Sequence, residues 1–414
     1  MEEWREYRVA EVIEDISMGP FGSNIKRDNY VDSGVPYLNG SNLSSYKLNE
    51  NSFYYVTEEK AKSLGRCVAK RGDIIVTHRG TIGQMSYIPF DSKYEHYLTG
   101  NSQFRLTVNK KVIRPDFFVY YFHTRMGQHR LLANASQVGV PALARPTSTF
   151  KEVLVPVPKM EVQNQIMDIL HSLDDKIEVN RRINDNLEQQ AQALFKSWFV
   201  DFEPFKDQPF VESELGMIPQ GWKVESLSSI ADYINGLAMQ KFRPEDGEKG
   251  LPVLKIKELG QGNVDDNSEL CSPSLIGKKY IINDGDIIFS WSGTLMVKVW
   301  CGGKCGLNQH LFVVNPKDYP KWFVYHWTKY HLDNFIRIAK DKAVTMGHIK
   351  RGELNKAMTV IPDKENMQRI DALMKPIFEQ IIANKLESCR LAELRDTLLP
   401  RLMSGELKVS DIKI

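Results

Sequence analysis

The sequence predicts an α+β protein in which two tandem globular units are separated by a long antiparallel two-helix coiled coil, with pseudo-twofold symmetry. Two observations predict this fold. The second half of the 414 residues repeats the first, at an offset that drifts from 218 residues (Trp4 to Trp222) to 204 residues (Ile177 to Ile381). A long helical pattern follows each copy. Because this period has the size of a domain plus a helix, we interpret the chain as a covalent pseudo-dimer.

Each globular copy combines strands and helices. In the first copy, residues 1–158, short apolar runs such as Asp73-Ile74-Ile75-Val76 are bounded by glycine and asparagine turns, which is typical of strands. The stretch 117–132 carries aromatic and aliphatic residues on one face and predicts a helix. The consecutive X-Pro steps of Val155-Pro156-Val157-Pro158 force an extended chain and end the unit. The second copy repeats this order over residues 222–363.

Residues 159–200 and 364–404 each predict one long helix, because apolar residues recur at alternating spacings of three and four. A helix of roughly 40 residues is about 60 Å long at ~1.5 Å per residue. Each helix alone would expose its apolar stripe to water, so we expect the two stripes to pair. Residues 201–221, with several prolines and glycines, connect the first helix to the second unit, and residues 405–414 form a C-terminal tail.

Asn180 and Asn384 are equivalent by the repeat and lie near the middle of their helices. A buried asparagine in a helix seam costs stability but fixes the register. In an antiparallel pair the two midpoints face each other, which predicts that Asn180 and Asn384 lie close together near the pseudo-twofold axis. The alternative is that both are exposed polar positions.

The charge is unevenly distributed although the whole chain carries only +2. Residues 1–159 contain 21 Lys and Arg against 16 Asp and Glu, a net charge of +5, and residues 222–364 contain 20 against 16, a net charge of +4. Residues 201–221 contain one basic and five acidic residues. Two basic units favour two separate contacts with a polyanion, although random surface variation is an alternative.

The composition indicates a soluble protein of the cytoplasm. No apolar run reaches the roughly 18 residues of a membrane span, and the acidic start Met-Glu-Glu-Trp lacks a signal-peptide pattern. The five cysteines are odd in number and scattered, which favours reduced thiols over a disulfide framework.

The two copies differ in the loops that follow shared strands. After the repeated Gly-Asp-Ile-Ile strand the exposed pair is His78-Arg79 in the first copy and Trp291-Ser292 in the second. Histidine and arginine donate hydrogen bonds to guanine edges or phosphates, whereas tryptophan stacks or wedges. In a second pair of loops, around Asn101 and Asn308, asparagine and glutamine can hydrogen-bond adenine. In a third pair, around Lys26 and Lys241, basic residues can contact phosphates.

Ordinary surface polarity is an alternative for any single residue in these loops, so the prediction rests on the sets. The candidate DNA-binding residues are Lys26, Arg27, His78, Arg79, Asn101, Gln103, Gln240, Lys241, Arg243, Trp291, Ser292, Asn308, Gln309 and His310.

Motifs for catalysis or metal binding are not recognisable. Cys301 and Cys305 supply two thiols where a structural zinc site needs four ligands, so a glycine-rich turn is the preferred interpretation. No Walker pattern occurs, and Asn315-Pro316-Lys317-Asp318-Tyr319 lacks the second proline and the glycine-rich loop of an adenine methyltransferase. We expect no catalytic residues, no metal site and no cofactor bound by this chain.

Three stretches resemble the specificity subunits of type I restriction-modification systems, and the resemblance spans essentially the whole chain. They are Leu194-Phe195-Lys196-Ser197-Trp198-Phe199-Val200-Asp201-Phe202-Glu203-Pro204, Leu394-Arg395-Asp396-Thr397-Leu398-Leu399-Pro400-Arg401-Leu402-Met403-Ser404-Gly405-Glu406-Leu407 and Pro219-Gln220-Gly221-Trp222.

The resemblance implies two target recognition domains, each reading one half of a bipartite sequence in double-stranded DNA, and a coiled coil that sets the gap between the halves. It also implies partners: methyltransferase subunits that use S-adenosylmethionine, and restriction/translocase subunits that use ATP and Mg. The specificity subunit itself is not an enzyme. The alternative function is a tandem coiled-coil scaffold without DNA recognition, which explains the repeat but not the two basic units.

Overall fold

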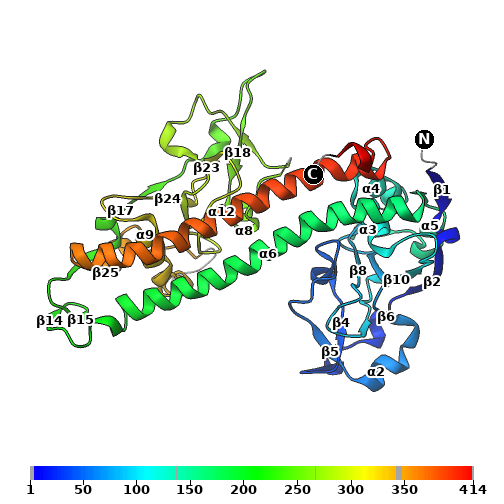
Figure 1. The fold of residues 1–414 in the computed structure, drawn as a ribbon, viewed down its shortest axis with the longest axis horizontal. Helices are drawn as coiled ribbons and strands as arrows, with labels where there is room; N and C mark the ends of the chain where they lie inside the picture. The colour runs from blue at the N-terminus through cyan, green and yellow to red at the C-terminus, as the bar shows by residue number, and fades with distance from the viewer. Residues whose placement is uncertain (1–3, 137–138, 266, 342–346, 413–414) are drawn as a thin grey trace. The chain divides into compact units, whose positions relative to one another are not determined.

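The computed structural model describes residues 4–136, 139–265, 267–341 and 347–412. The chain divides into two compact units, the first formed by Met1–Asp174 with Glu393–Ile414 and the second by Asp175–Ala392. Two long helices, α6 (Met160–Phe199) and α12 (Lys364–Met403), each contribute residues to both units (Figure 1).

The first unit contains an antiparallel sheet in the order β2-β10-β7-β8 and a second, mixed sheet in the order β3-β5-β4-β9-β6. Their strands are β2 (Ile13–Met18), β10 (Gln103–Val108), β7 (Ile74–Thr77), β8 (Met85–Tyr87), β3 (Tyr30–Val31), β5 (Tyr54–Val56), β4 (Val35–Tyr37), β9 (His96–Leu98) and β6 (Val68–Lys70).

Smaller elements complete the first unit. They are the strand pair β1 (Arg5–Arg8) and β13 (Leu154–Val157), the strand pair β11 (Ala135–Ser136) and β12 (Ala142–Leu143), and the helices α1 (Val9–Val12), α2 (Glu58–Ser63), α3 (Pro115–His123), α4 (Arg125–Leu132) and α5 (Pro146–Lys151).

The second unit repeats this plan with the sheet orders β17-β24-β21-β22 and β19-β18-β23-β20. Its strands are β17 (Ala231–Asn235), β24 (Leu311–Pro316), β21 (Ile287–Ser290), β22 (Met296–Val299), β19 (Leu270–Cys271), β18 (Leu251–Leu254), β23 (Cys305–Leu307), β20 (Ile281–Ile282), the pair β14 (Phe210–Ser213) and β15 (Gly216–Pro219), and the pair β16 (Lys223–Ser226) and β25 (Met358–Ile361). Its short helices are α7 (Leu227–Ile230), α8 (Ile256–Gln261), α9 (Lys321–Tyr330), α10 (Leu332–Asp341) and α11 (Gly352–Lys356).

The core of each unit includes parts of both long helices. In the first unit Ile166 and Leu170 of α6 and Leu402 of α12 belong to the same buried cluster as Phe118 of α3. In the second unit Phe199 of α6 packs on aromatic rings of α9, with ring centroids 5.4 to 6.2 Å apart. Burying the apolar stripe of a helix supplies most of the stability of that helix, so each globular part and its helix segments form one core.

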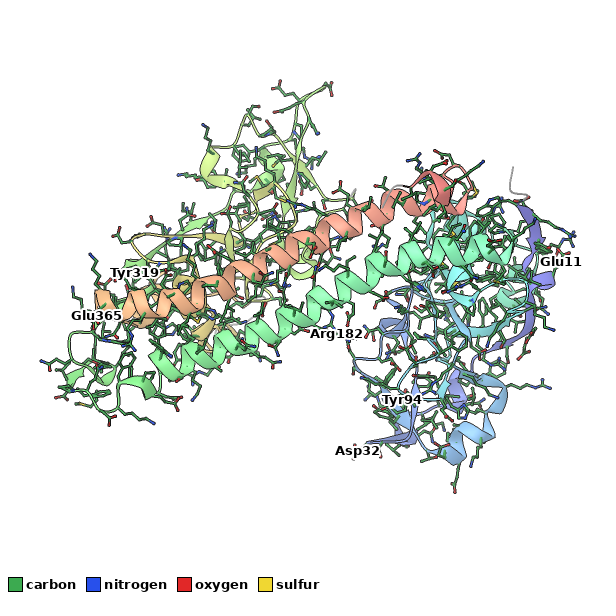
Figure 2. All side chains as sticks on the ribbon, viewed as in Figure 1. Glu11, Asp32, Tyr94, Arg182, Tyr319 and Glu365 are labelled. Atoms are coloured by element: carbon green, nitrogen blue, oxygen red, sulfur yellow. The ribbon has the colours of Figure 1, made fainter. Side chains whose placement is uncertain are left out.

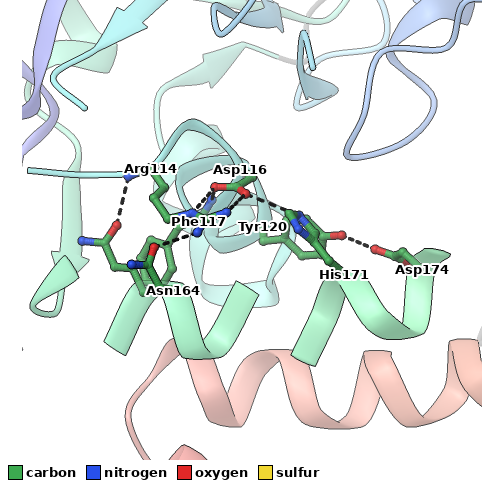
Figure 3. A network of polar contacts seen from close by, with 8 residues as sticks. Arg114, Asp116, Phe117, Tyr120, Asn164, His171 and Asp174 are labelled. Atoms are coloured by element: carbon green, nitrogen blue, oxygen red, sulfur yellow. Dashed lines mark hydrogen bonds and ion pairs between the residues drawn. The ribbon is translucent and has the colours of Figure 1, made fainter. Parts of the chain in front are cut away.

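A polar network ties α3 to α6 within the first unit (Figure 3). The Arg114 guanidinium donates to both carboxylate oxygens of Asp116, at 3.0 and 2.6 Å, and to Asn164 Oδ1 of α6 at 2.7 Å. His171 Nε2 lies 3.4 Å from Asp116 Oδ2. Bidentate pairing of arginine with a carboxylate is strong and directional, so this network fixes how the start of α3 lies against α6.

Within the second unit the two long helices run antiparallel, because residues with increasing numbers in α6 contact residues with decreasing numbers in α12. Asn384 Nδ2 donates to Asn184 Oδ1 at 2.9 Å, and Asn180 Nδ2 donates to Glu387 Oε2 at 2.7 Å and to Ser388 Oγ at 3.4 Å. All three asparagines are buried. On the outer side of α6, Glu178 instead pairs with Arg182, which is exposed (Figure 2).

The expected burial of Asn180 and Asn384 in the helix seam is therefore confirmed, and each of them bonds a residue that lies four positions from the other asparagine. Asn384 bonds Asn184, and Asn180 bonds Ser388. These two contacts are equivalent by the repeat, because Asn180 and Asn384, like Asn184 and Ser388, are 204 residues apart. The pseudo-twofold relation therefore holds for this pair of contacts.

Removing Arg395 will destabilise the first unit. Its Nη1 lies 2.7 Å from Asp174 Oδ1, both side chains are less than one fifth exposed, and its guanidinium lies 5.2 Å from the centre of the Tyr46 ring. Breaking a fully buried ion pair costs about 3–5 kcal/mol, so Arg395→Ala in this partly hydrated pair should lower the free energy of unfolding by roughly 2–3 kcal/mol. Chemical denaturation measures the loss. The exposed Arg390→Ala variant is the control, and an equal stability of both variants would contradict the expected role of Arg395.

The second unit should lose stability in acid because of His326. Burial lowers the pKa of its imidazole from 6.5 to about 3, with a smaller contribution from Lys329. Below pH 6.5 the unfolded chain binds a proton that the folded unit excludes, so stability falls as the pH drops from 6.5 towards 3, by about 2 kcal/mol at pH 5. Above pH 6.5 the effect vanishes.

His326→Phe keeps a planar ring against Phe195, whose centroid lies 5.5 Å from that of His326, and should flatten the pH dependence of unfolding. Substitution of the exposed His129 should leave the profile unchanged. If the His326→Phe profile overlaid that of the original chain, the assignment would be wrong.

Candidate nucleic-acid interface

Three loops of the first unit meet at one end of the sheet β2-β10-β7-β8. The register pairs Met18, the last residue of β2, with Phe104, and pairs Thr77, the last residue of β7, with Gln103, the first residue of β10. Backbone hydrogen bonds continue past the strands, from Gly19 N to Gln103 O (2.8 Å) and from His78 N to Ser102 O (2.9 Å). We call residues 19–29, 78–84 and 99–102 the first tip.

The second unit forms the same arrangement. Asn235 at the end of β17 pairs with Phe312, and Ser290 at the end of β21 pairs with Leu311. The bonds past the strands are from Gly236 N to Leu311 O (3.0 Å) and from Trp291 N to His310 O (3.4 Å). Residues 236–243, 291–295 and 308–310 are the second tip. Every candidate residue except Gln103, which begins β10, therefore lies within one of the two tips.

A fourth segment joins each tip, and sequence analysis missed it. In the first unit Gly80 N donates to Pro141 O and Leu143 N donates to His78 O, both at 2.8 Å. In the second, Gly293 N donates to Gly347 O at 3.0 Å and Ile349 N donates to Trp291 O at 3.1 Å. In the first unit the segment leads to Arg145, just before α5, two residues after the bond between Leu143 and His78. In the second unit it leads to Arg351, just before α11, whose Nη2 donates to Tyr233 O of β17 at 2.7 Å.

Arg145 is a further candidate residue beside the first tip. It is exposed and adopts φ 44°, a left-handed conformation that is rare for residues other than glycine. Strained backbone of this kind persists where the surrounding structure imposes it, and it is often found at functional sites. No local pattern could have indicated Arg145, since its approach to the tip depends on bonds to a loop some sixty residues earlier in the chain.

The first tip exposes cationic and amide side chains. Lys26, Arg27, Arg79 and Asn101 are exposed. His78 is half-buried, and burial, the largest influence, lowers the pKa of its imidazole below the usual value, so the ring is neutral at pH 7. Its Nε2 is buried without a hydrogen-bond partner among the described residues. The neutral ring therefore adds no positive charge to the first tip, whose exposed cations are Lys26, Arg27 and Arg79.

Gln103 does not belong to this surface. Only 2% of the residue is exposed, and its Oε1 accepts a hydrogen bond from Gly100 N at 2.8 Å. The amide closes the turn that leads into β10, so the structure does not place Gln103 among the exposed residues of the first tip.

The second tip is more apolar than the first. Trp291 is half-buried, its Nε1 donates to Asn235 Oδ1 at 2.8 Å, and its ring lies 5.7 Å from that of Phe312. Gln309 and His310 are half-buried and contact each other, with 3.3 Å between their Nε2 atoms. These side chains form a preorganised platform with an aromatic face and an amide.

The outer loop of the second tip carries the exposed side chains, namely Gln240, Lys241 and Arg243, of which Arg243 lies 4.0 Å from Glu269. Two other candidates are not at the surface. Ser292 is 5% exposed and Asn308 is 8% exposed. The sequence did not indicate this burial, because side chains beside a strand end point inward as often as outward.

A further feature of the chain is the state of its cysteines and of its possible metal ligands. All five cysteines are free thiols, and burial raises the pKa of Cys301 to about 11 and that of Cys305 to about 12. Among the residues that the structure describes, no three or more His, Cys, Asp or Glu side chains form a group that could hold a metal ion. Within the same residues, no helix combines the length and apolar character needed to cross a membrane.

Known proteins are similar to this chain in sequence. A family model described as the type I restriction modification DNA specificity domain matches residues 1–189 and 219–391. The specificity subunit of the type I restriction enzyme MjaIX from Methanocaldococcus jannaschii is 29% identical to this chain, over 97% of this chain and 93% of that protein. The corresponding HindI subunit from Haemophilus influenzae is 26% identical, over 98% of this chain and all of that protein.

A solved structure agrees at the level of the fold. The S subunit of a type I restriction-modification system from M. genitalium aligns with a TM-score of 0.52 and 15% identity, over 97% of this chain and 96% of that one. The two stretches matched by the family model cover most of the sequence, and the chain therefore belongs to the type I restriction-modification DNA specificity family.

Proposed function

We propose that this chain is the sequence-specific DNA-binding subunit of a type I restriction-modification complex, in which each unit reads one half of a bipartite DNA site. One observation carries the proposal: equivalent strand ends hold two tips of different chemistry. A shared scaffold with different exposed side chains suits two different half-sites, because direct readout depends on the donors and acceptors presented to the base edges. Membership of the family favours this function over a scaffold without DNA recognition.

In this proposal residues 1–158 and 222–363 are the two target recognition domains, and α6 and α12 form one continuous antiparallel coiled coil. The antiparallel contacts at Asn184 and Asn384 in the second unit, and the ion pair of Asp174 with Arg395 in the first, support a single register along both helices. About 60 Å of helix separates two readers by one to two turns of DNA at ~34 Å per turn. The coil then sets the gap between the half-sites.

The proposed partners are double-stranded DNA, methyltransferase subunits that dock on the helices and domains, and restriction/translocase subunits. S-adenosylmethionine, ATP and Mg serve those partners, and this chain contributes recognition without catalysis, in the cytoplasm. The names of the relatives, each called a specificity subunit of a restriction enzyme, support assembly with other subunits of such a system.

Exposed cations of the first tip should contribute phosphate contacts. Lys26→Ala combined with Arg27→Ala removes two exposed charges and should weaken binding to cognate and random duplex alike. Each lost phosphate contact lowers the slope of log K against log salt by about 1, so the slope should fall by about 2. Fluorescence anisotropy of the chain assembled with its methyltransferase partner, titrated at several salt concentrations, measures both effects.

Lys110→Ala combined with Lys111→Ala is the matched control. These lysines follow β10 and so lie at the opposite end of the sheet from the first tip. Equal losses in the two double variants would show non-specific attraction to the whole unit, and salt-insensitive binding by the original complex would favour the scaffold.

The length of the helices should set the gap between the half-sites. Deleting one heptad from each helix, at positions related by the repeat, shortens the coil by ~10 Å and should shorten the preferred gap by about three base pairs at ~3.4 Å each. Mapping methylated adenines in DNA exposed to the variant complex reads the gap directly. Adding one heptad to each helix should lengthen it by the same amount, and an unchanged gap in both variants refutes the coil as the determinant of spacing.

A further inference from the structure

Phe21 is exposed to an unusual degree. It is 81% exposed, the largest value for any large apolar side chain among the described residues. Isolated apolar residues are common on protein surfaces and need no explanation by themselves. Phe21 differs because it stands in the loop that leaves β2, within the first tip.

The backbone beneath Phe21 is tightly constrained. Gly19 N donates to Gln103 O at 2.8 Å, and a Cβ at position 19 would lie 2.1 Å from Gly100 O, so only glycine permits this approach of the loop to the sheet. Asn24 N donates to Phe21 O at 2.8 Å and closes a turn over Gly22–Asn24. The loop therefore holds the ring on a short, ordered support, which reduces the entropy lost when the ring contacts a ligand.

The surroundings of Phe21 are those of a nucleic-acid surface. Residue 22 adjoins Asn101, since a Cβ there would lie 3.4 Å from Asn101 Nδ2. Lys26 and Arg27 follow on the same loop, and both are exposed. Within the described part of the chain, the Phe21 ring stacks on no other aromatic ring. An exposed ring beside cations matches the wedge residues that enter DNA at a base-pair step, where phosphates need neutralising close by.

The second tip carries a different residue at the position equivalent to Phe21. Gly236 approaches the backbone there as Gly19 does in the first tip, with a Cβ position 2.2 Å from Asn308 O. Counting from these glycines, the position of Phe21 is occupied by Ala238. Phe242 on the equivalent loop packs against a buried cluster that includes Met239. Trp291, which follows another strand, is held at the second tip by Asn235. The two tips thus present their aromatic rings from different loops.

We propose that Phe21 inserts its ring at a base-pair step of the first half-site and unstacks that step. This inference rests on the proposed function and assigns one recognition contact to a residue that the sequence pattern did not single out. Selectivity follows from the cost of unstacking, which is lowest at flexible pyrimidine–purine steps, so the ring favours half-sites that contain such a step at the position it reaches.

The test uses the chain assembled with its methyltransferase partner, on the bipartite site defined by the adenines that this complex methylates. 2-Aminopurine is placed in turn at each step of both half-sites. Binding of the original complex should increase the fluorescence at one step of the first half-site. Phe21→Ala should abolish that increase, leave the probes of the second half-site unchanged, and weaken binding by roughly fivefold to a hundredfold, the range expected from the loss of one stacking contact.

Two further variants make the result specific. Phe21→Trp keeps an aromatic wedge and should retain the fluorescence change. Phe90→Ala removes a phenylalanine that is 59% exposed in the same unit, but whose ring contacts Gly72 ahead of β7, at the opposite end of the sheet, and it should behave as the original complex. Thermal melting of each variant excludes loss of folding as the cause.

The outcomes separate the two proposals. If the original complex binds no specific sequence, the proposed function fails. If it binds a specific site and Phe21→Ala matches Phe90→Ala in affinity and in every probe, the function stands and the role of Phe21 is overturned. A loss of affinity without any change at a 2-aminopurine step would also overturn the wedge, because it would show contact without insertion.

Discussion

The register between the long helices is the constraint on which the second unit depends. The apolar stripes of α6 and α12 need a partner, but apolar contacts alone tolerate sliding by a turn. The buried bond between Asn384 and Asn184 removes that freedom, because a shifted register would leave an amide without a partner in the seam. The aromatic packing of Phe199 on α9 then places the globular part on a helix pair that has one alignment.

The antiparallel sheets impose a second constraint, because they determine where the loops with the candidate DNA-binding residues lie. β2 and β7 end where β10 begins, and β17 and β21 end where β24 begins. Three loops must therefore meet at one edge in each unit, whatever their side chains are. The common edge explains why residues as distant in sequence as Lys26, Arg79 and Asn101 belong to one surface.

Much of the scaffold could be predicted from the sequence, because periodicity and repetition are properties of many residues together. The heptads of α6 and α12 extend over many turns, and the repeated Gly-Asp-Ile-Ile strand marks equivalent edges in both units. The candidate residues of the tips followed from their places beside strand ends. Their individual orientations did not follow, since a single residue beside a strand points either way, and Gln103, Ser292 and Asn308 proved to be buried.

Contacts between distant segments were also beyond prediction. Asn184, rather than Asn180, is the partner of Asn384, because helix geometry offsets facing positions by one turn. Arg145 reaches the first tip through backbone bonds that no local pattern encodes. Phe21 was overlooked because an isolated phenylalanine after Gly-Pro predicts a core residue as readily as an exposed one, and only the fold distinguishes them.

The loops of both tips are fastened to their sheets through main-chain groups, such as Gly19 N with Gln103 O and Gly236 N with Leu311 O. These main-chain hydrogen bonds do not depend on the side chains farther out on each loop. Replacing the outer loop residues therefore leaves the framework intact. The chain is thus a scaffold in which the specificity for each half-site can be exchanged separately.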